Sequence, residues 1–195
     1  LVMRDSEVLV RNGVTVSDLY LGREGTITVE SGCTLKGVIR SATPEGLSLW
    51  DNETILLKDS TISTATLYAP EYYNLQIHAN NSVIQNLTVI LPECYERGTD
   101  DYISLTGSTI TNSNVAYLCA GNDTRIGDVS VARFQSMGSN VLLTGDITIT
   151  QKMECYSGVN ADGHAITLDI TKWKVADDAI INNYTNISNA AMKIL

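Results

Sequence analysis

The most constraining feature of this sequence is a short apolar alternation that recurs along the chain and is interrupted each time by turn-forming residues. In "TITVESGCTLKGVIRS", residues 26–41, Ile27 and Val29 alternate with polar neighbours until Ser31 and Gly32 interrupt the pattern. Alternation with a period of two indicates β-strands, and Gly, Asn, Asp and Ser indicate turns. The same plan recurs at 8–16, 26–35, 47–57, 75–84, 103–111, 125–134, 141–149 and 166–175.

The breaks in these alternations are spaced by about 20 residues, with two longer steps. They fall at Gly13, Gly32, Asn52-Glu53, Asn80-Asn81, Gly107, Gly127-Asp128 and Gly145. A unit of this length cannot bury its own inward side chains, but stacked units give one another a continuous aliphatic core. We therefore predict an all-β fold, a right-handed parallel β-helix (β-solenoid) of about eight irregular rungs with two longer loops. Residues 1–195 would form a single solenoid domain.

A β-sandwich is the alternative fold, because "RNGV" and "TGD" resemble the tight turns of antiparallel strands. Two observations favour the solenoid. The motif reappears in the same order along the chain and not as mirrored pairs. Aromatic residues make up only 6%, with one Phe, whereas narrow β-helix cores suit stacked aliphatic side chains.

Composition narrows the classes of function. Ile, Val and Thr number 18, 15 and 21, which favours strands over helices. The formal net charge is −9, and the 13 Lys and Arg residues form no cluster, so we expect no nucleic-acid partner. No apolar run is long enough to span a bilayer, so we expect no direct membrane insertion of this segment. The start on Leu and the apolar finish "AAMKIL" suggest a piece of a larger protein.

The residues that could carry chemistry are scattered. Cys33, Cys94, Cys119 and Cys155 include no C-x-x-C pair, so we expect no metal site and no cofactor. Burial in strands is the first interpretation of these cysteines, and disulfides remain open. His78 and His164 have no partner that the sequence places. Carboxylates could pair, as in polysaccharide-cleaving enzymes, at Asp100-Asp101, Asp123 with Asp128, Asp162, and Asp177-Asp178.

Solvated turn carboxylates are the plainer interpretation of those aspartates, so we assign no catalytic residue and expect binding more than catalysis. Two insertions, "YAPEYYN" at 68–74 and "PECYERGTDDY" at 92–102, are rich in tyrosine. Loops that project from a solenoid often bind ligands, and tyrosine combines contact area with a polar tip. Covering the adjacent rungs is an equal role for these side chains. The candidate ligand-binding residues are Tyr68, Tyr72, Tyr73, Tyr95 and Tyr102.

The stretch "VTVSDLYLGREGTITVESGCTLKGVIRS" at 14–41 resembles the passenger repeats of bacterial autotransporter adhesins of the AIDA type. Those rungs carry Val-rich alternations punctuated by Gly, with Thr following the Gly. The ending, residues 168–189, is similar to the closing coils of bacterial β-helical surface proteins. The double glycine typical of the family is absent and the rungs vary in length. The resemblance carries over no catalytic residue.

The resemblance implies export and display, hence an extracellular or bacterial cell-surface location. We expect a segment of an exported surface protein that acts as an adhesin-like binding module or structural stalk. Its partner would be a ligand on a host or neighbouring cell, either glycan or protein. The alternative is a carbohydrate-active enzyme of the β-helix type, a polysaccharide lyase or hydrolase. The oligomeric state is not indicated.

Overall fold

The computed structural model describes residues 1, 6–22, 25–41, 52–68, 74–90, 102–169, 171, 181–182 and 186–195. Those residues contain 18 β-strands and no α-helix. Every pairing between the strands is parallel. A sandwich requires antiparallel pairs. The predicted parallel β-helix is therefore confirmed, and the sandwich alternative is wrong.

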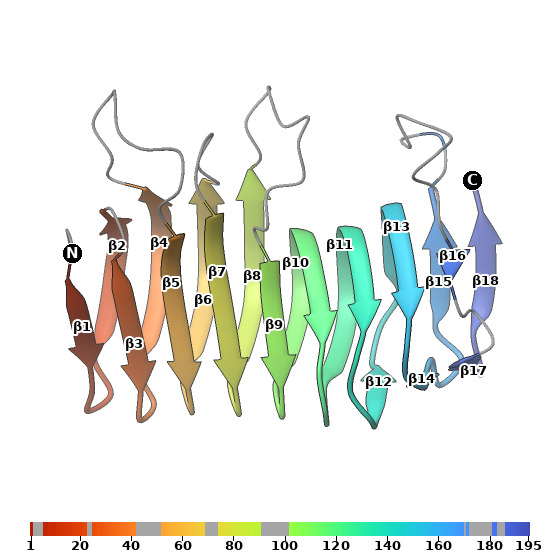
Figure 1. The fold of residues 1–195 in the computed structure, drawn as a ribbon, viewed down its shortest axis with the longest axis horizontal. Coiled ribbons are helices and arrows are strands. Elements are labelled where there is room, and N and C mark those ends of the chain that lie inside the picture. The colour runs from red at the N-terminus through yellow and green to blue at the C-terminus, as the bar shows by residue number, and fades with distance from the viewer. Residues whose placement is uncertain are drawn as a thin grey trace.

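One side of the helix is a parallel sheet with one strand segment from each coil, here called the first sheet (Figure 1). Three of its later segments are the C-terminal parts of long strands that also contribute to the opposite side. In order, the strands are β1 (Glu7–Val10), β3 (Thr26–Glu30), β5 (Asn52–Lys58), β7 (Asn74–Asn80), β9 (Tyr102–Thr106), β10 (Thr109–Ala120), β11 (Arg125–Ser136), β13 (Ile147–Cys155) and β16 (Ile181–Asn182).

The opposite side, here called the second sheet, begins with β2 (Thr15–Leu21), β4 (Thr34–Ser41), β6 (Thr61–Tyr68) and β8 (Val83–Ile90). It continues through the first halves of β10 and β11. The last coils add β12 (Val141–Leu143), β14 (Val159–Asn160), β15 (Ala165–Leu168), β17 (Ile187–Ser188) and β18 (Ala191–Ile194).

The coil is right-handed. In Figure 1 the near strands of the first sheet run downward and β2, β4, β6 and β8 run upward behind them, while the chain advances from the N-terminal end at the left to the C-terminal end at the right. This is the hand expected for parallel strands joined by crossovers. Hydrogen bonds between equivalent positions of successive coils include spans of 17, 18, 20, 22 and 26 residues. The coils therefore differ in length.

The core consists of columns of aliphatic side chains that stack from coil to coil. The strand register aligns one inward residue from each coil of the first sheet. All the members of this column are at most 4% exposed: Ile27, Ile55, Ile77, Ile103, Leu118, Phe134 and Met153. Each coil thus supplies the apolar surface that its neighbours bury, as the sequence predicts.

The stretch 31–33 is a corner and not a hairpin turn. It links β3 of the first sheet to β4 of the second sheet, and these two strands pair with other strands. Ser31 adopts a positive φ of 58°. Equivalent corners use Asp59, Asn81, Gly107 and Asp123, which are residue types that tolerate the left-handed region.

A buried ladder of small polar residues follows this corner. The backbone N–H of Ser60 donates to Ser82 Oγ at 3.2 Å, and the N–H of Ser82 donates to Ser108 Oγ at 3.0 Å. Cys33 belongs to the same column. Its carbonyl accepts a hydrogen bond from Thr61 N–H in the next coil, just as the Ser60 carbonyl accepts one from Val83 N–H. Cys33 is buried with a free thiol, so the interpretation as a packing residue is confirmed.

The predicted breaks belong to two different corners. Gly13, Gly32, Asn81 and Gly107 lie at the corner just described, as expected. Asp128 lies instead at a second bend inside β11, where its carboxylate accepts from Asp146 N–H in the next coil at 3.3 Å. That bend recurs at positive-φ residues within the strands of the second sheet, namely Asp18, Gly37, Thr64, Asn86 and Asn112.

One predicted break is wrong. Asn52 and Glu53 lie inside β5, in register with Asn74 and Leu75 of the next coil. Glu53 is only 1% exposed. Their polarity suggests a turn in the sequence, but backbone pairing along the first sheet decides their conformation.

Candidate functional site

The outward face of the first sheet carries two adjacent columns of polar and aromatic side chains. The register aligns Gln76, Tyr102, Tyr117 and Arg133 in one column. It aligns His78, Ser104, Cys119 and Gln135 in the other. All these side chains are partly exposed. We call the set Gln76, His78, Tyr102, Ser104, Tyr117 and Gln135 the outer strip.

His78 and Ser104 form a close pair at the centre of the strip. The distance from His78 Nδ1 to Ser104 Oγ is 2.8 Å. The His78 and Tyr102 rings pack edge to face, with centroids 5.4 Å apart and an interplanar angle of 81°. Burial lowers the pKa of the His78 imidazole below its ordinary value, so the neutral ring predominates at pH 7. A neutral imidazole can either donate or accept a hydrogen bond here.

Tyr117 extends the aromatic row by one coil. Its ring centroid lies 6.1 Å from that of Tyr102, with the two planes tilted by 56°. The Tyr117 hydroxyl donates to Gln135 Oε1 at 2.6 Å, which holds the ring over the sheet. The strip therefore presents rings from consecutive coils, flanked by amide, hydroxyl and imidazole groups.

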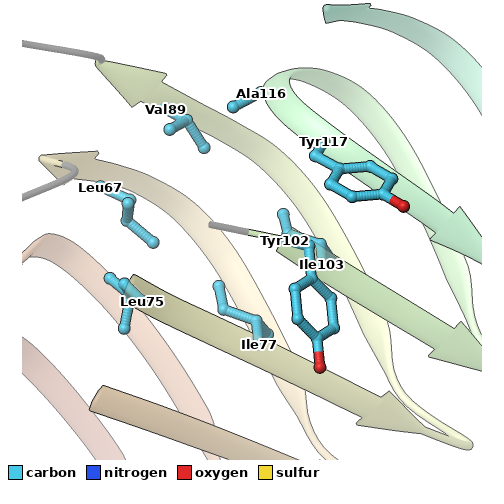
Figure 2. A pocket seen from close by; sticks show the side chains of 8 residues that line it. All are labelled: Leu67, Leu75, Ile77, Val89, Tyr102, Ile103, Ala116 and Tyr117. Carbon is cyan, nitrogen blue, oxygen red and sulfur yellow. The ribbon is translucent and has the colours of Figure 1, made fainter. Parts of the chain in front are cut away.

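A small apolar hollow with a volume of about 20 Å³ lies between the two sheets at the edge of the strip, and the core residues Ile77 and Ile103 help to line it. Figure 2 shows the Tyr102 and Tyr117 rings on one side of it, with Ile103 beside Tyr102, and Leu67, Leu75 and Val89 on the other side. The aliphatic side chains come from both sheets and include Leu67, Leu75, Val89 and Ala116. This volume holds about one water-sized group, and an apolar lining disfavours water.

The two predicted loop tyrosines that the structure describes lie on different sheets. Tyr102 begins β9 in the first sheet and belongs to the outer strip. Tyr68 ends β6 in the second sheet and is 41% exposed. Tyr72, Tyr73 and Tyr95 lie outside the described residues. The structure adds Tyr117 and His78, which the sequence-based selection did not include.

The carboxylates at the corners bond to neighbouring coils. Asp123 Oδ1 accepts from Asn140 Nδ2 at 2.7 Å, whereas Asp128 Oδ1 accepts from the backbone of Asp146. Asp123 and Asp128 therefore serve different corners. Asp146 Oδ1 also lies 3.7 Å from His164 Nδ1. Asp100, Asp101, Asp177 and Asp178 lie outside the described residues.

The cysteines differ in exposure. Cys33 and Cys155 are buried in the core and Cys119 is partly exposed on the first sheet, all three with free thiols. Burial raises the pKa of the Cys155 thiol to about 11 and also raises the pKa of Cys119. Cys94 lies outside the described residues. Across the described ranges, no group of three or more His, Cys, Asp and Glu side chains could hold a metal ion.

No family model, curated protein or solved structure matches the chain. In the part of the chain that the structure describes, no helix has the length and apolar character needed to cross a membrane.

Proposed function

We propose that this chain is a ligand-binding segment of an exported bacterial surface protein, with an adhesin-like role on the cell surface. The observation that carries the proposal is the aromatic row formed by His78, Tyr102 and Tyr117 on the outward face of the first sheet. Tyrosine rings supply contact area at low cost in conformational entropy, and their hydroxyl groups supply specificity.

The β-helix supports this use because it is a rigid base. The outer strip stands on β7, β9, β10 and β11, whose inward residues are packed into one continuous core. A binding surface on a regular sheet needs little ordering when a ligand arrives, which lowers the cost of binding. The resemblance of residues 14–41 to adhesin passenger repeats supports the same role.

A carbohydrate-active enzyme is the second candidate, and the His78–Ser104 pair favours it. A neutral imidazole on the outward face can take up a proton, which is the general-base role that a lyase or hydrolase requires. Glycosidic cleavage is normally carried out by paired carboxylates, and the described candidates Asp123 and Asp128 accept hydrogen bonds at two different corners. Binding is therefore the better supported function.

The test is binding of the labelled full chain to a panel of bacterial and animal cells, measured by flow cytometry. We expect saturable binding that falls at least about tenfold in the Tyr102→Ala, Tyr117→Ala double variant. The matched control is Tyr20→Ala on the second sheet, where Arg40 stacks on the ring at 4.9 Å. Equal binding by the double variant and the wild type would overturn the proposal. Polysaccharide cleavage that is lost in His78→Ala would establish the enzyme instead.

A further inference from the structure

We infer that the outward face of the first sheet recognises a glycan through the carboxylate of one acidic sugar, which pairs with Arg133 beside the Tyr117 ring. This inference rests on the proposed function and names its ligand class. Three features of the described residues carry it: the position of Arg133 in the column of tyrosines, the unused part of its guanidinium group, and the distribution of charge around it.

Arg133 continues the aromatic row at the next coil. The register places Tyr102, Tyr117 and Arg133 at equivalent positions of β9, β10 and β11, and all three side chains are partly exposed. Neighbouring strands of a sheet lie about 4.8 Å apart, so a sugar ring packed on Tyr117 brings its substituents within reach of Arg133. The aromatic ring offers apolar contact to the C–H face of the sugar, and the guanidinium group offers paired hydrogen bonds to a carboxylate.

The guanidinium group of Arg133 is anchored but only partly used. Its Nε donates to Gln151 Oε1 at 3.1 Å. Gln151 lies at a bulge in β13, where the register with β11 shifts, and such bulges redirect side chains on a sheet. Among the described residues, no acceptor takes a hydrogen bond from the two terminal Nη groups of Arg133. These groups form the planar fork that binds the two oxygens of a carboxylate.

Arg40 on the second sheet gives a useful contrast. Its guanidinium carbon lies 4.9 Å from the centroid of the Tyr20 ring, and its Nη2 lies 3.5 Å from the Tyr20 hydroxyl. Arg40 therefore uses its guanidinium group on a ring of its own sheet, whereas Arg133 is anchored through Nε alone. The aromatic row of the first sheet thus ends in a guanidinium group that is available to a ligand.

The charge around Arg133 favours a single carboxylate over a densely charged chain. Lys152 follows Arg133 in the column, but its Nζ lies 3.1 Å from Glu154 Oε1, so these two charges largely cancel. Arg133 therefore supplies the local positive charge beside the tyrosines. The whole chain carries −9, which repels a polyanion. A glycan in which one acidic sugar is flanked by neutral sugars matches both conditions.

The experiment titrates the full chain calorimetrically with matched glycans that differ only in the acid group. One pair is sialyllactose and its methyl ester, which keeps the shape of the sugar and removes its charge. The other pair is a disaccharide of glucuronic acid and glucose with its methyl ester, since the inference is to the carboxylate and not to one sugar. We expect the free acid to bind about tenfold more tightly in at least one pair, and added salt to reduce the difference.

Three variants assign the preference to the guanidinium group. Arg133→Gln should abolish the preference for the free acid while leaving the affinity for the ester unchanged. Arg133→Lys keeps the charge but loses the fork, so part of the preference should remain. Arg125→Gln is the matched control, because it removes an exposed arginine from the second sheet, and it should keep the full preference. Circular dichroism and thermal unfolding confirm that each variant folds.

The outcomes also separate this inference from the proposed function. Equal affinity for acid and ester in both pairs, or a preference that survives in Arg133→Gln, would overturn the inference. Cell binding that depends on Tyr102 and Tyr117 but is unchanged in Arg133→Gln would also overturn it and would leave the proposed function standing. Cell binding that depends on Arg133 but persists after enzymatic removal of glycans would identify an acidic protein ligand, against the inference. Failure of the proposed function gives a different result, namely cell binding that does not depend on the tyrosines.

Discussion

The inward and outward side chains of the first sheet come from the same strands, yet they vary differently along the solenoid. The inward column is aliphatic and buried through Ile27, Ile55, Ile77 and Ile103. The outward column beside it changes chemistry at each coil, as Leu56, His78 and Ser104 follow one another. Packing between coils constrains the inner set, whereas solvent tolerates many residue types outside. The difference teaches that architecture resides in the inner columns and recognition in the outer ones.

The largest expected effect is on stability, from truncating one inward residue. Ile77→Ala removes a side chain that is 1% exposed and leaves a cavity between coils, so the free energy of unfolding should fall by about 2–5 kcal/mol. Gln76 is the outward neighbour of Ile77, and Gln76→Ala should change the free energy of unfolding by about 0.5 kcal/mol or less. Urea unfolding followed by circular dichroism measures both. Similar losses from the two variants would contradict the division into inner and outer columns.

A smaller loss is expected at the corner ladder. Ser82→Ala leaves the buried backbone N–H of Ser60 without its acceptor, which should cost about 1–3 kcal/mol. Ser63→Ala is the matched control. The Ser63 hydroxyl accepts from Gln85 on the partly exposed side, so its loss should cost about 0.5 kcal/mol or less. The same unfolding measurement applies. A neutral Ser82→Ala would show that another group satisfies the corner.

The smallest effect is a difference in thiol reactivity between the two columns. Burial raises the pKa of inward Cys155 to about 11, so at pH 8 its reactive thiolate is scarce, and the core also blocks reagents. Iodoacetamide should therefore label Cys155 more than about tenfold more slowly than the outward Cys119 in the folded chain. Peptide mapping by mass spectrometry gives the two rates. In denaturant the two cysteines should be labelled at similar rates. Equal rates in the native state as well would contradict the assignment of Cys155 to the interior.

The repeat could be recognised from sequence because strand alternation and turn residues are local signals. Two strands and a corner are predicted from "VLVRNGVTV" or from "TITVESGCTL" without reference to the rest of the chain. Which of the two corners a given break belongs to could not be recognised in the same way. Gly32 and Gly145 look alike in sequence, but Gly32 lies at the corner between the sheets and Gly145 packs on Asp128 at the other bend. Both bends require residues that tolerate compact or left-handed backbone, so both attract Gly, Asn and Asp.

The outer strip was less accessible to sequence reasoning. Tyr102 attracts attention because it closes a tyrosine-rich insertion, but Tyr117 sits within an ordinary strand. Those two positions are closer in sequence than the average repeat of about 20 residues, so a fixed period does not align them. The register of β9 with β10 does, because the coil between them is short. His78 joins the strip for the same reason, through pairing of β7 with β9.

By itself, the sequence determined the parallel β-helix, the position of the corner after Glu30 and the interior place of Cys33. These follow from local alternation and turn chemistry that recur along the chain. Such signals can be recognised in each unit without knowing how long each coil is. The tertiary structure alone decided which outward residues share a column, and hence that His78, Tyr102 and Tyr117 form one row while Tyr68 lies on the other sheet. The physical reason is that coil lengths differ, so lateral neighbours are set by hydrogen-bond register and packing between coils, not by distance along the sequence.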